Sequence, residues 1–179
     1  MKSIFVSFDE IGWYCLREIL RMGGEVSGIF TLTDERLAKM SGARPFDDLA
    51  AEFSVPLYKI KNINDAGTME AVKDCAPDIS FVVGWSQLVK SEFIKAAAYT
   101  TVGMHPTLLP RHRGRAPLPW AIIMGLKKTG VTMFHIDLEA DNGEIIGQVE
   151  VDIEFEDDAA SLYRKTLDAH VDLIRSYWP

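Results

Sequence analysis

Cysteine is scarce in this sequence, with two in 179 residues. Cys15 and Cys75 have neither the number that a disulfide framework needs nor the spacing of metal ligands. Both lie in apolar segments of helical periodicity, so we expect two buried free thiols. That usage favours a reducing compartment. The four histidines also show no metal-ligand spacing with the cysteines or with each other, so no metal site is expected.

Long apolar runs and an excess of positive charge are also lacking. No window approaches the roughly 18 uncharged apolar residues of a membrane-spanning helix. The first apolar run breaks at Asp9 and is too short for a signal peptide. A net charge of −7 and a pI near 5.1 argue against general binding to nucleic acids or anionic membranes. We therefore expect a cytoplasmic protein without a membrane or nucleic-acid partner.

What the sequence does contain is a regular alternation of strand and helix patterns. Apolar and helical periodicities predict strands at 2–8, 26–32, 55–60, 78–83, 101–104, 130–136 and 144–153, and helices at 10–22, 49–53, 65–75, 118–125 and 158–177. Such βαβ units predict an α/β fold, a mainly parallel twisted sheet with helices on both faces. The length and the absence of linkers favour a single domain over residues 1–179.

The turn after the first strand lacks the GxGxxG pattern, so a nicotinamide cofactor is not expected. In sheets of this kind, ligands bind outside the carboxyl ends of the strands, near the point where the strand order reverses. Gly84-Trp85-Ser86-Gln87 follows one predicted strand, and His105 closes the next. These two segments should therefore lie on the same rim.

His105 opens the loop HPTLLPRHRG, where three prolines from Pro106 to Pro117 make the backbone stiff. A single histidine at a strand end is often a packing residue, but rigidly held loops are where functional groups concentrate. Asp141-Asn142-Gly143 is a turn pattern that also offers a carboxylate to orient His105 and stabilise its imidazolium form. Asp137 and Glu139 compete for that role.

A second group of polar residues is the basic cluster of Arg111, Arg113 and Arg115 with His112. Such a run is commonly a solvated loop. Because arginine makes bidentate contacts with phosphate, the cluster also suits an anionic ligand. Trp85 and Trp120 are candidates to line a pocket for a flat ring, although large aromatic residues mostly lie in cores.

The stretch from Gly103 to Gln148 resembles the folate-dependent formyltransferase family, in its NxHxSLLPxYRG loop, the following helix and its DxG loop. That family includes methionyl-tRNA formyltransferase, glycinamide ribonucleotide formyltransferase and the sugar N-formyltransferases. Weaker similarity covers the first half of the chain. The segment from Arg113 to Pro117 looks most like the sugar-nucleotide branch, and no C-terminal tRNA-binding domain is expected.

The resemblance implies a Rossmann-like formyltransferase fold and transfer of a formyl group from 10-formyltetrahydrofolate to the primary amine of a small acceptor, a nucleotide-linked amino sugar. It implies catalytic roles for His105 and Asp141 and leaves a homodimer open. The residues implied to bind folate are Gly84, Trp85, Ser86, Gln87, Leu88, Ile136, Leu138, Glu139 and Ala140. Those implied to bind the acceptor are Thr107, Arg113 and Arg115.

One departure from the family pattern is Gly103, which stands where the family has an asparagine. The asparagine amide donates to the developing oxyanion, and loss of one such donor costs about 10²–10³ in rate. Protonated His105 could carry part of that load, and a water or another side chain could fill the space. The candidate side chains are Ser86, Gln87, Asn142 and Gln148. Two alternatives to transfer therefore stay open: a domain that binds folate or a sugar nucleotide without transferring, and a formyl hydrolase.

Overall fold

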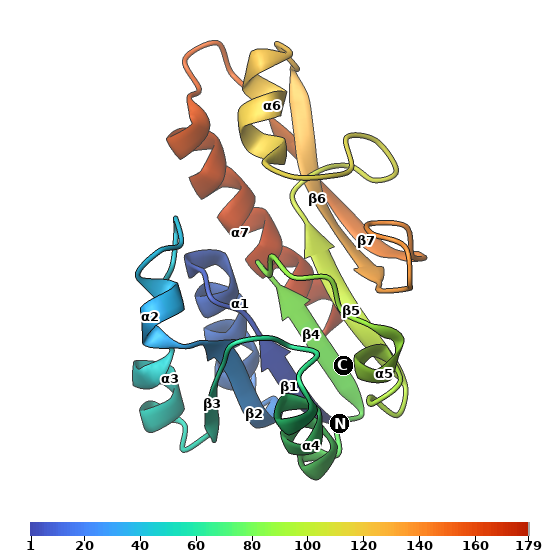
Figure 1. Ribbon diagram of the computed structural model, residues 1–179. Helices are drawn as coiled ribbons and strands as arrows, with labels where there is room; N and C mark the ends of the chain where they lie inside the picture. Colours follow the sequence, from blue (N-terminus) through green and yellow to red (C-terminus); the bar gives the residue numbers. More distant parts are fainter. Residues whose placement is uncertain (179) are drawn as a thin grey trace.

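The computed structural model describes residues 1–178, so Pro179, the end of the expected domain, lies outside the described residues. The elements in chain order are β1 (Lys2–Val6), α1 (Glu10–Arg21), β2 (Glu25–Leu32), α2 (Asp34–Leu37), α3 (Asp47–Glu52), β3 (Leu57–Ile60), α4 (Ala66–Cys75), β4 (Ile79–Val83), α5 (Ser91–Ile94), β5 (Thr100–His105), α6 (Pro117–Ile123), β6 (Lys128–His135), β7 (Ile145–Asp152) and α7 (Ala159–Tyr177) (Figure 1). The predicted elements are present. The sequence did not predict α2 and α5, because four residues are too few to show a helical period.

The seven strands form one sheet in the order β3-β2-β1-β4-β5-β6-β7. The pairs from β3 to β5 are parallel, whereas β6 and β7 pair antiparallel. The predicted α/β class with a mainly parallel sheet is thus confirmed. From β1 the chain runs outward to β2 and β3, then returns to place β4 on the other side of β1. The strand order therefore reverses between β1 and β4.

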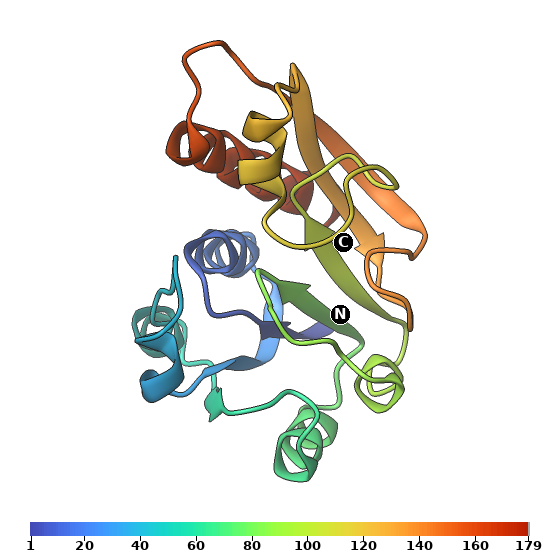
Figure 2. The same cartoon turned by 45° about the horizontal axis from the view of Figure 1, so that its top comes forward.

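Helices cover both faces of the sheet, with α1 and α7 on one side and α4 and α5 on the other (Figure 2). The larger core lies on the first side, where Leu16 and Ile19 of α1 and Leu162 and Ile174 of α7 are completely buried. Each such side chain contributes about 1.5–3 kcal/mol relative to an exposed one. A smaller core beneath α4 and α5 includes Phe93.

Two carboxylates fix where these covering helices begin. Asp9 caps α1 by accepting a hydrogen bond from the Gly12 amide at 2.9 Å. Asp158 caps α7 in a capping box with Ser161. Both cysteines are free and buried, as predicted. Within residues 1–178 no helix is long and apolar enough to span a bilayer.

Candidate functional site

The candidate site lies at the carboxyl end of β5, where His105 is the last residue of the strand. The loop between β6 and β7 brings Asp141 to it, and Asp141 Oδ1 lies 3.8 Å from His105 Nδ1. The two side chains are only 12% and 23% exposed. Asp137 instead accepts from the Glu139 amide, and Glu139 accepts from the Asn142 side chain. Of the three competing acids, Asp141 is the one that faces His105.

The loop after β5, residues 106–116, is tied to the Asp141 loop by two further contacts. The Gly114 amide donates to Asp141 Oδ2 at 3.2 Å, and Arg113 donates to Asn142 Oδ1 at 2.7 Å. His112 and Asp141 both adopt left-handed backbone conformations, with φ of 56° and 53°. Non-glycine residues rarely do so unless the surrounding structure imposes it. The two loops therefore hold each other in a defined geometry.

A buried hydroxyl on β6 supports the start of the loop that follows His105. Thr132 Oγ1 donates to the Thr107 carbonyl at 2.7 Å and accepts from the Leu109 amide at 3.0 Å. Gln148 on β7 donates to the same hydroxyl and to the Leu109 carbonyl. The side chains of Thr132 and Gln148 thus satisfy backbone amide and carbonyl groups of the loop that form no hydrogen bonds within the sheet.

His105 is placed to accept a proton. Burial lowers the pKa of its imidazole below the ordinary value, and the Asp141 carboxylate and the His112 backbone oppose that shift. The ring is therefore neutral at pH 7, while a carboxylate stands ready to stabilise the charged form. Its Nε2 is buried and has no hydrogen-bond partner within residues 1–178. A proton acceptor without a partner is what a base requires before substrate binds.

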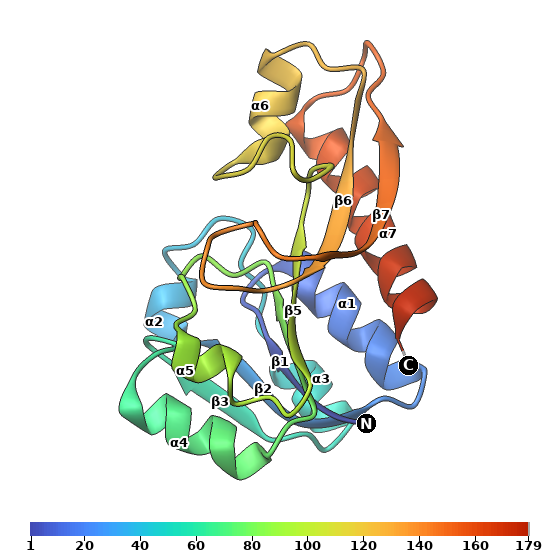
Figure 3. The same cartoon turned by 90° about the vertical axis from the view of Figure 1, so that its right-hand side faces the viewer.

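His105 and Asp141 line a cavity of about 160 Å³ between the segments 84–89 and 136–141. Figure 3 shows the β6–β7 loop reaching toward the loop after β4. Leu88 and Leu138, one from each wall, are both 75% exposed, and the buried indole N–H of Trp85 has no hydrogen-bond partner in the described part of the chain. All the residues implied to bind folate line this cavity except Ser86, which lines a separate one. The arrangement suits a flat ring that carries hydrogen-bonding groups.

A second cavity, of about 360 Å³, lies on the other side of the loop after β5. Thr107, Arg113 and Arg115 line it together with Trp120, so the three residues implied to bind the acceptor share one space. Thr107 is 2% exposed, and none of the residues that the structure describes forms a hydrogen bond with its hydroxyl. Trp120 is 56% exposed. Cationic and aromatic groups thus face one ligand-sized cavity.

A larger side chain at Gly103 would require the Ile136 side chain to shift. A Cβ at this position would lie 2.9 Å from Ile136 Cγ1 and 3.1 Å from Phe134 Cζ. Contacts under 3.0 Å force a neighbour to move. The space that an asparagine would enter is therefore already filled by Ile136.

The four candidate replacements for an oxyanion donor have other positions or partners. The Gln87 amide donates to the Lys61 carbonyl and accepts from the Ile63 amide. Asn142 donates to Glu139, and Gln148 supports the loop as described. Ser86 lies outside the cavity of His105. None of these groups takes the place of the asparagine amide.

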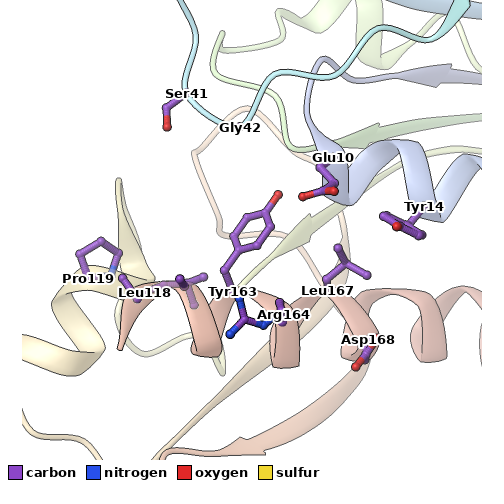
Figure 4. A pocket seen from close by; sticks show the side chains of 12 residues that line it. Glu10, Tyr14, Ser41, Gly42, Leu118, Pro119, Tyr163, Arg164, Leu167 and Asp168 are labelled. Atoms are coloured by element: carbon purple, nitrogen blue, oxygen red, sulfur yellow. The ribbon is translucent and has the colours of Figure 1, made fainter. Parts of the chain in front are cut away.

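A third cavity, of about 830 Å³, was not apparent from the sequence (Figure 4). It is a groove between the start of α1, the 41–42 turn and the first turns of α6 and α7. Glu10 and Tyr163 lie on its walls, and Figure 4 shows the Tyr163 hydroxyl pointing toward Glu10. Burial and the carboxylates of Asp9 and Glu10 raise the pKa of this phenol. Periodicity had marked these positions only as parts of helices.

Comparison with known proteins identifies relatives of this chain. The chain is 29% identical over 178 residues to a methionyl-tRNA formyltransferase of Alkaliphilus oremlandii. The aligned residues make up 98% of this chain but 57% of that protein. The chain thus spans little more than half the length of that relative. A crystal structure of phosphoribosylglycinamide formyltransferase from Bacillus halodurans matches with a TM-score of 0.81 at 22% identity, covering 97% of this chain and 91% of that one.

A sugar 3N-formyl transferase solved in the presence of dTDP and 5-N-formyl-THF matches with a TM-score of 0.75 at 17% identity, covering 98% of this chain and 61% of that one. At these identities the two solved structures establish the fold alone. The sequence model of the formyl transferase family matches residues 13–176, which include His105, Asp141 and both loops around them. The chain belongs to the formyl transferase family.

Proposed function

We propose that this protein is an N-formyltransferase that moves a formyl group from 10-formyltetrahydrofolate to the primary amine of a nucleotide-linked amino sugar. The observation that carries the proposal is the His105–Asp141 pair, held at 3.8 Å by two mutually tied loops on the wall of a cavity. Membership of the family supports formyl transfer. The identity of the acceptor rests on the chemistry of the second cavity.

In the proposed reaction the acceptor amine attacks the formyl carbon, and a new C–N bond forms as the carbonyl oxygen becomes negative. His105 accepts a proton from the amine nitrogen, and Asp141 stabilises the resulting imidazolium. His105 then returns the proton to the folate nitrogen as the old C–N bond breaks. The low pKa of His105 suits the first step, and the nearby carboxylate suits the second.

The cavity between the segments 84–89 and 136–141 is the proposed site of the donor's ring. Exposed Leu88 and Leu138 offer apolar faces at its two walls, and Trp85 offers an unpaired donor. Buried polar groups without partners cost free energy until a ligand satisfies them. The ring of the donor would supply those partners. The remainder of the donor would extend into solvent.

The second cavity is the proposed site of the nucleotide part of the acceptor. Arg113 and Arg115 suit a diphosphate, because guanidinium groups bind phosphate oxygens in bidentate fashion. The exposed indole of Trp120 offers a surface for a base. The solved sugar 3N-formyl transferase with dTDP supports this class of acceptor by analogy of fold. Thr107 would complete the site with its unpaired hydroxyl.

The test is release of tetrahydrofolate from 10-formyltetrahydrofolate, with and without a panel of amino-sugar nucleotides, together with the mass of the product. We expect acceptor-dependent release and a gain of one formyl group. His105→Gln and Asp141→Asn should lower kcat by at least about 10²-fold while the circular dichroism spectrum is retained. Full activity in either variant would refute the assigned roles.

Gly103 favours a second candidate function, binding of folate or a sugar nucleotide without transfer. Because Ile136 fills the space of the missing amide, the single variant Gly103→Asn should be destabilised and gain no activity. Gly103→Asn combined with Ile136→Ala restores both the amide and its space. A rate gain of about 10²-fold in the double variant would mean that an oxyanion donor is missing. Binding of folate without turnover in the wild-type protein would establish the second function.

A further inference from the structure

The strand order of the sheet reverses between β1 and β4, which is where open α/β sheets characteristically bind ligands. The residue at that point is Asp9, which follows β1 and caps α1. The site described above uses β4, β5 and the β6–β7 loop, and gives Asp9 no role. Asp9 is therefore a carboxylate at a characteristic ligand-binding position that the site described above does not use.

Asp9 reaches sideways from β1 onto the neighbouring strand. Its carboxylate atoms lie 2.1–2.2 Å from the point where a Cβ on Gly84 would stand, so the carboxylate occupies the space of the missing side chain. Gly84 follows β4, and β4 pairs with β5, which ends at His105. Adjacent strands are about 4.8 Å apart. The Asp9 carboxylate thus lies beside the residue that follows β4, and β4 is the neighbour of the strand that ends at His105.

Among residues 1–178, only one oxygen of this carboxylate has hydrogen-bond partners. Oδ1 accepts from the Gly12 amide at 2.9 Å and from the Ser7 hydroxyl at 3.3 Å. Oδ2 accepts no hydrogen bond from residues 1–178, and no cationic side chain among them pairs with Asp9. The nearby Arg44 instead lies 3.7 Å from Glu10. Consistently, burial raises the pKa of the Asp9 carboxyl to about 7. A buried anion is costly unless a cation or donor pairs with it.

The large groove of Figure 4 gives a ligand access to this end of α1. Glu10, the residue after Asp9, lines it, as does Gly42, whose carbonyl accepts from the Glu10 amide. The start of a helix commonly attracts anions. Here two carboxylates of the chain itself, Asp9 and Glu10, already stand at that position. An incoming phosphate would be repelled and an ammonium group attracted.

We propose that Asp9 binds the acceptor, its free oxygen Oδ2 pairing with the ammonium form of the acceptor's amino group and holding it beside His105. This inference rests on the proposed function, because the acceptor is taken to be an amino sugar. Before reaction the ammonium group gives one proton to Asp9 Oδ2, which frees the lone pair of the amine for attack. His105 removes the second proton, which the amine nitrogen releases after attack, and passes it to the folate nitrogen. The phosphates lie away from this point, against Arg113 and Arg115.

The test is calorimetric binding of UDP-glucosamine and UDP-glucose at pH 7.5 in the absence of folate. The two probes differ in an amine and a hydroxyl, so the ratio of their dissociation constants isolates the amine. We expect the wild-type protein to prefer UDP-glucosamine by about tenfold or more. Asp9→Asn, which keeps the cap on α1, should bring the ratio close to one and leave the affinity for UDP-glucose within about twofold. Asp65→Asn, at the start of α4, is the matched control and should keep the wild-type ratio.

An unchanged ratio in Asp9→Asn, equal binding of the two sugars by the wild-type protein, or binding of neither would overturn the inference. Failure of formyl transfer with an Asp9-dependent preference for the amine would refute the proposed function and leave the binding role intact. Formyl transfer with an unchanged acceptor KM in Asp9→Asn would support the proposed function and refute the binding role of Asp9. In a transferring enzyme the variant should raise the acceptor KM about tenfold and leave the KM for the folate donor unchanged.

Discussion

Asp9→Asn should make the protein more stable, and more so as the pH rises. Burial raises the pKa of this carboxyl from 3.8 to about 7, a difference of about three units. Between these values the folded state retains a proton that the unfolded state has released, so unfolding becomes easier as the pH rises through that window. At 1.36 kcal/mol for each unit, the full effect is roughly 4 kcal/mol. Asparagine keeps the cap on α1 and does not titrate.

The measurement is urea unfolding followed by circular dichroism at pH 4.5, 6.0, 7.0 and 8.0. The free energy of unfolding of the variant relative to wild type should increase across this series by roughly 3 kcal/mol, because part of the full effect is already present at pH 4.5, above the unfolded-state pKa of 3.8. Asp157→Asn provides a control of opposite sign, since Lys165 holds the pKa of Asp157 at about 2. Its loss of stability should be present at neutral pH and fade below about pH 4. A difference between Asp9→Asn and wild type that did not vary with pH would refute the reasoning.

Three further predictions concern the support of the site. Burial lowers the pKa of His170 to about 4, so the stability that this neutral histidine contributes should be lost as the pH drops from about 6.5 to 4, and the free energy of unfolding of wild type relative to His170→Asn should fall across that range in urea titrations. A Cβ at Gly143 would lie 1.5 Å from the His135 carbonyl oxygen, so Gly143→Ala should lower the Tm markedly, whereas Gly67→Ala in open space should not. Thr132→Val, which removes the hydroxyl shared by Thr107, Leu109 and Gln148, should cost about 1–3 kcal/mol in urea unfolding and slow formyl transfer, and Thr132→Ser should restore both.

The sequence predicted the rim of the site because strand ends are readable from apolar periodicity. His105 closes an apolar run, and the glycine of the segment at 84 closes another, so parallel pairing alone places them together. The choice among Asp137, Glu139 and Asp141 was not readable. It depends on a left-handed residue at Asp141 and on hydrogen bonds within a loop, which leave no periodic trace. The family resemblance pointed to Asp141, and the structure places that residue at 3.8 Å from His105.

The role proposed for Asp9 was out of reach of sequence patterns for a different reason. Aspartate before an amphipathic helix already has a sufficient explanation as a cap. Its position over β4 depends on the strand order β1-β4-β5, because residues 9 and 84 become neighbours only after the chain has passed through β2 and β3. Ser86, by contrast, was predicted from the sequence to bind the ligand but does not line the cavity of His105. It belongs to the predicted segment, yet the turn after Gly84 directs it to another cavity.

At both Gly84 and Gly103, on the rim of the site, another residue occupies the space where a side chain would stand. At Gly84 the missing side chain is replaced by the Asp9 carboxylate, and at Gly103 it is replaced by Ile136. In each case a residue from another element has taken the space, so a larger side chain at the glycine forces that neighbour to shift. Restoring an asparagine at position 103 therefore requires a change at Ile136 as well, because Ile136 occupies the space of its side chain. With no amide at position 103, the imidazolium that forms when neutral His105 accepts the amine proton should stabilise more of the charge on the oxyanion. The rate should therefore depend more steeply on the Asp141 carboxylate than in a relative in which an amide shares that charge.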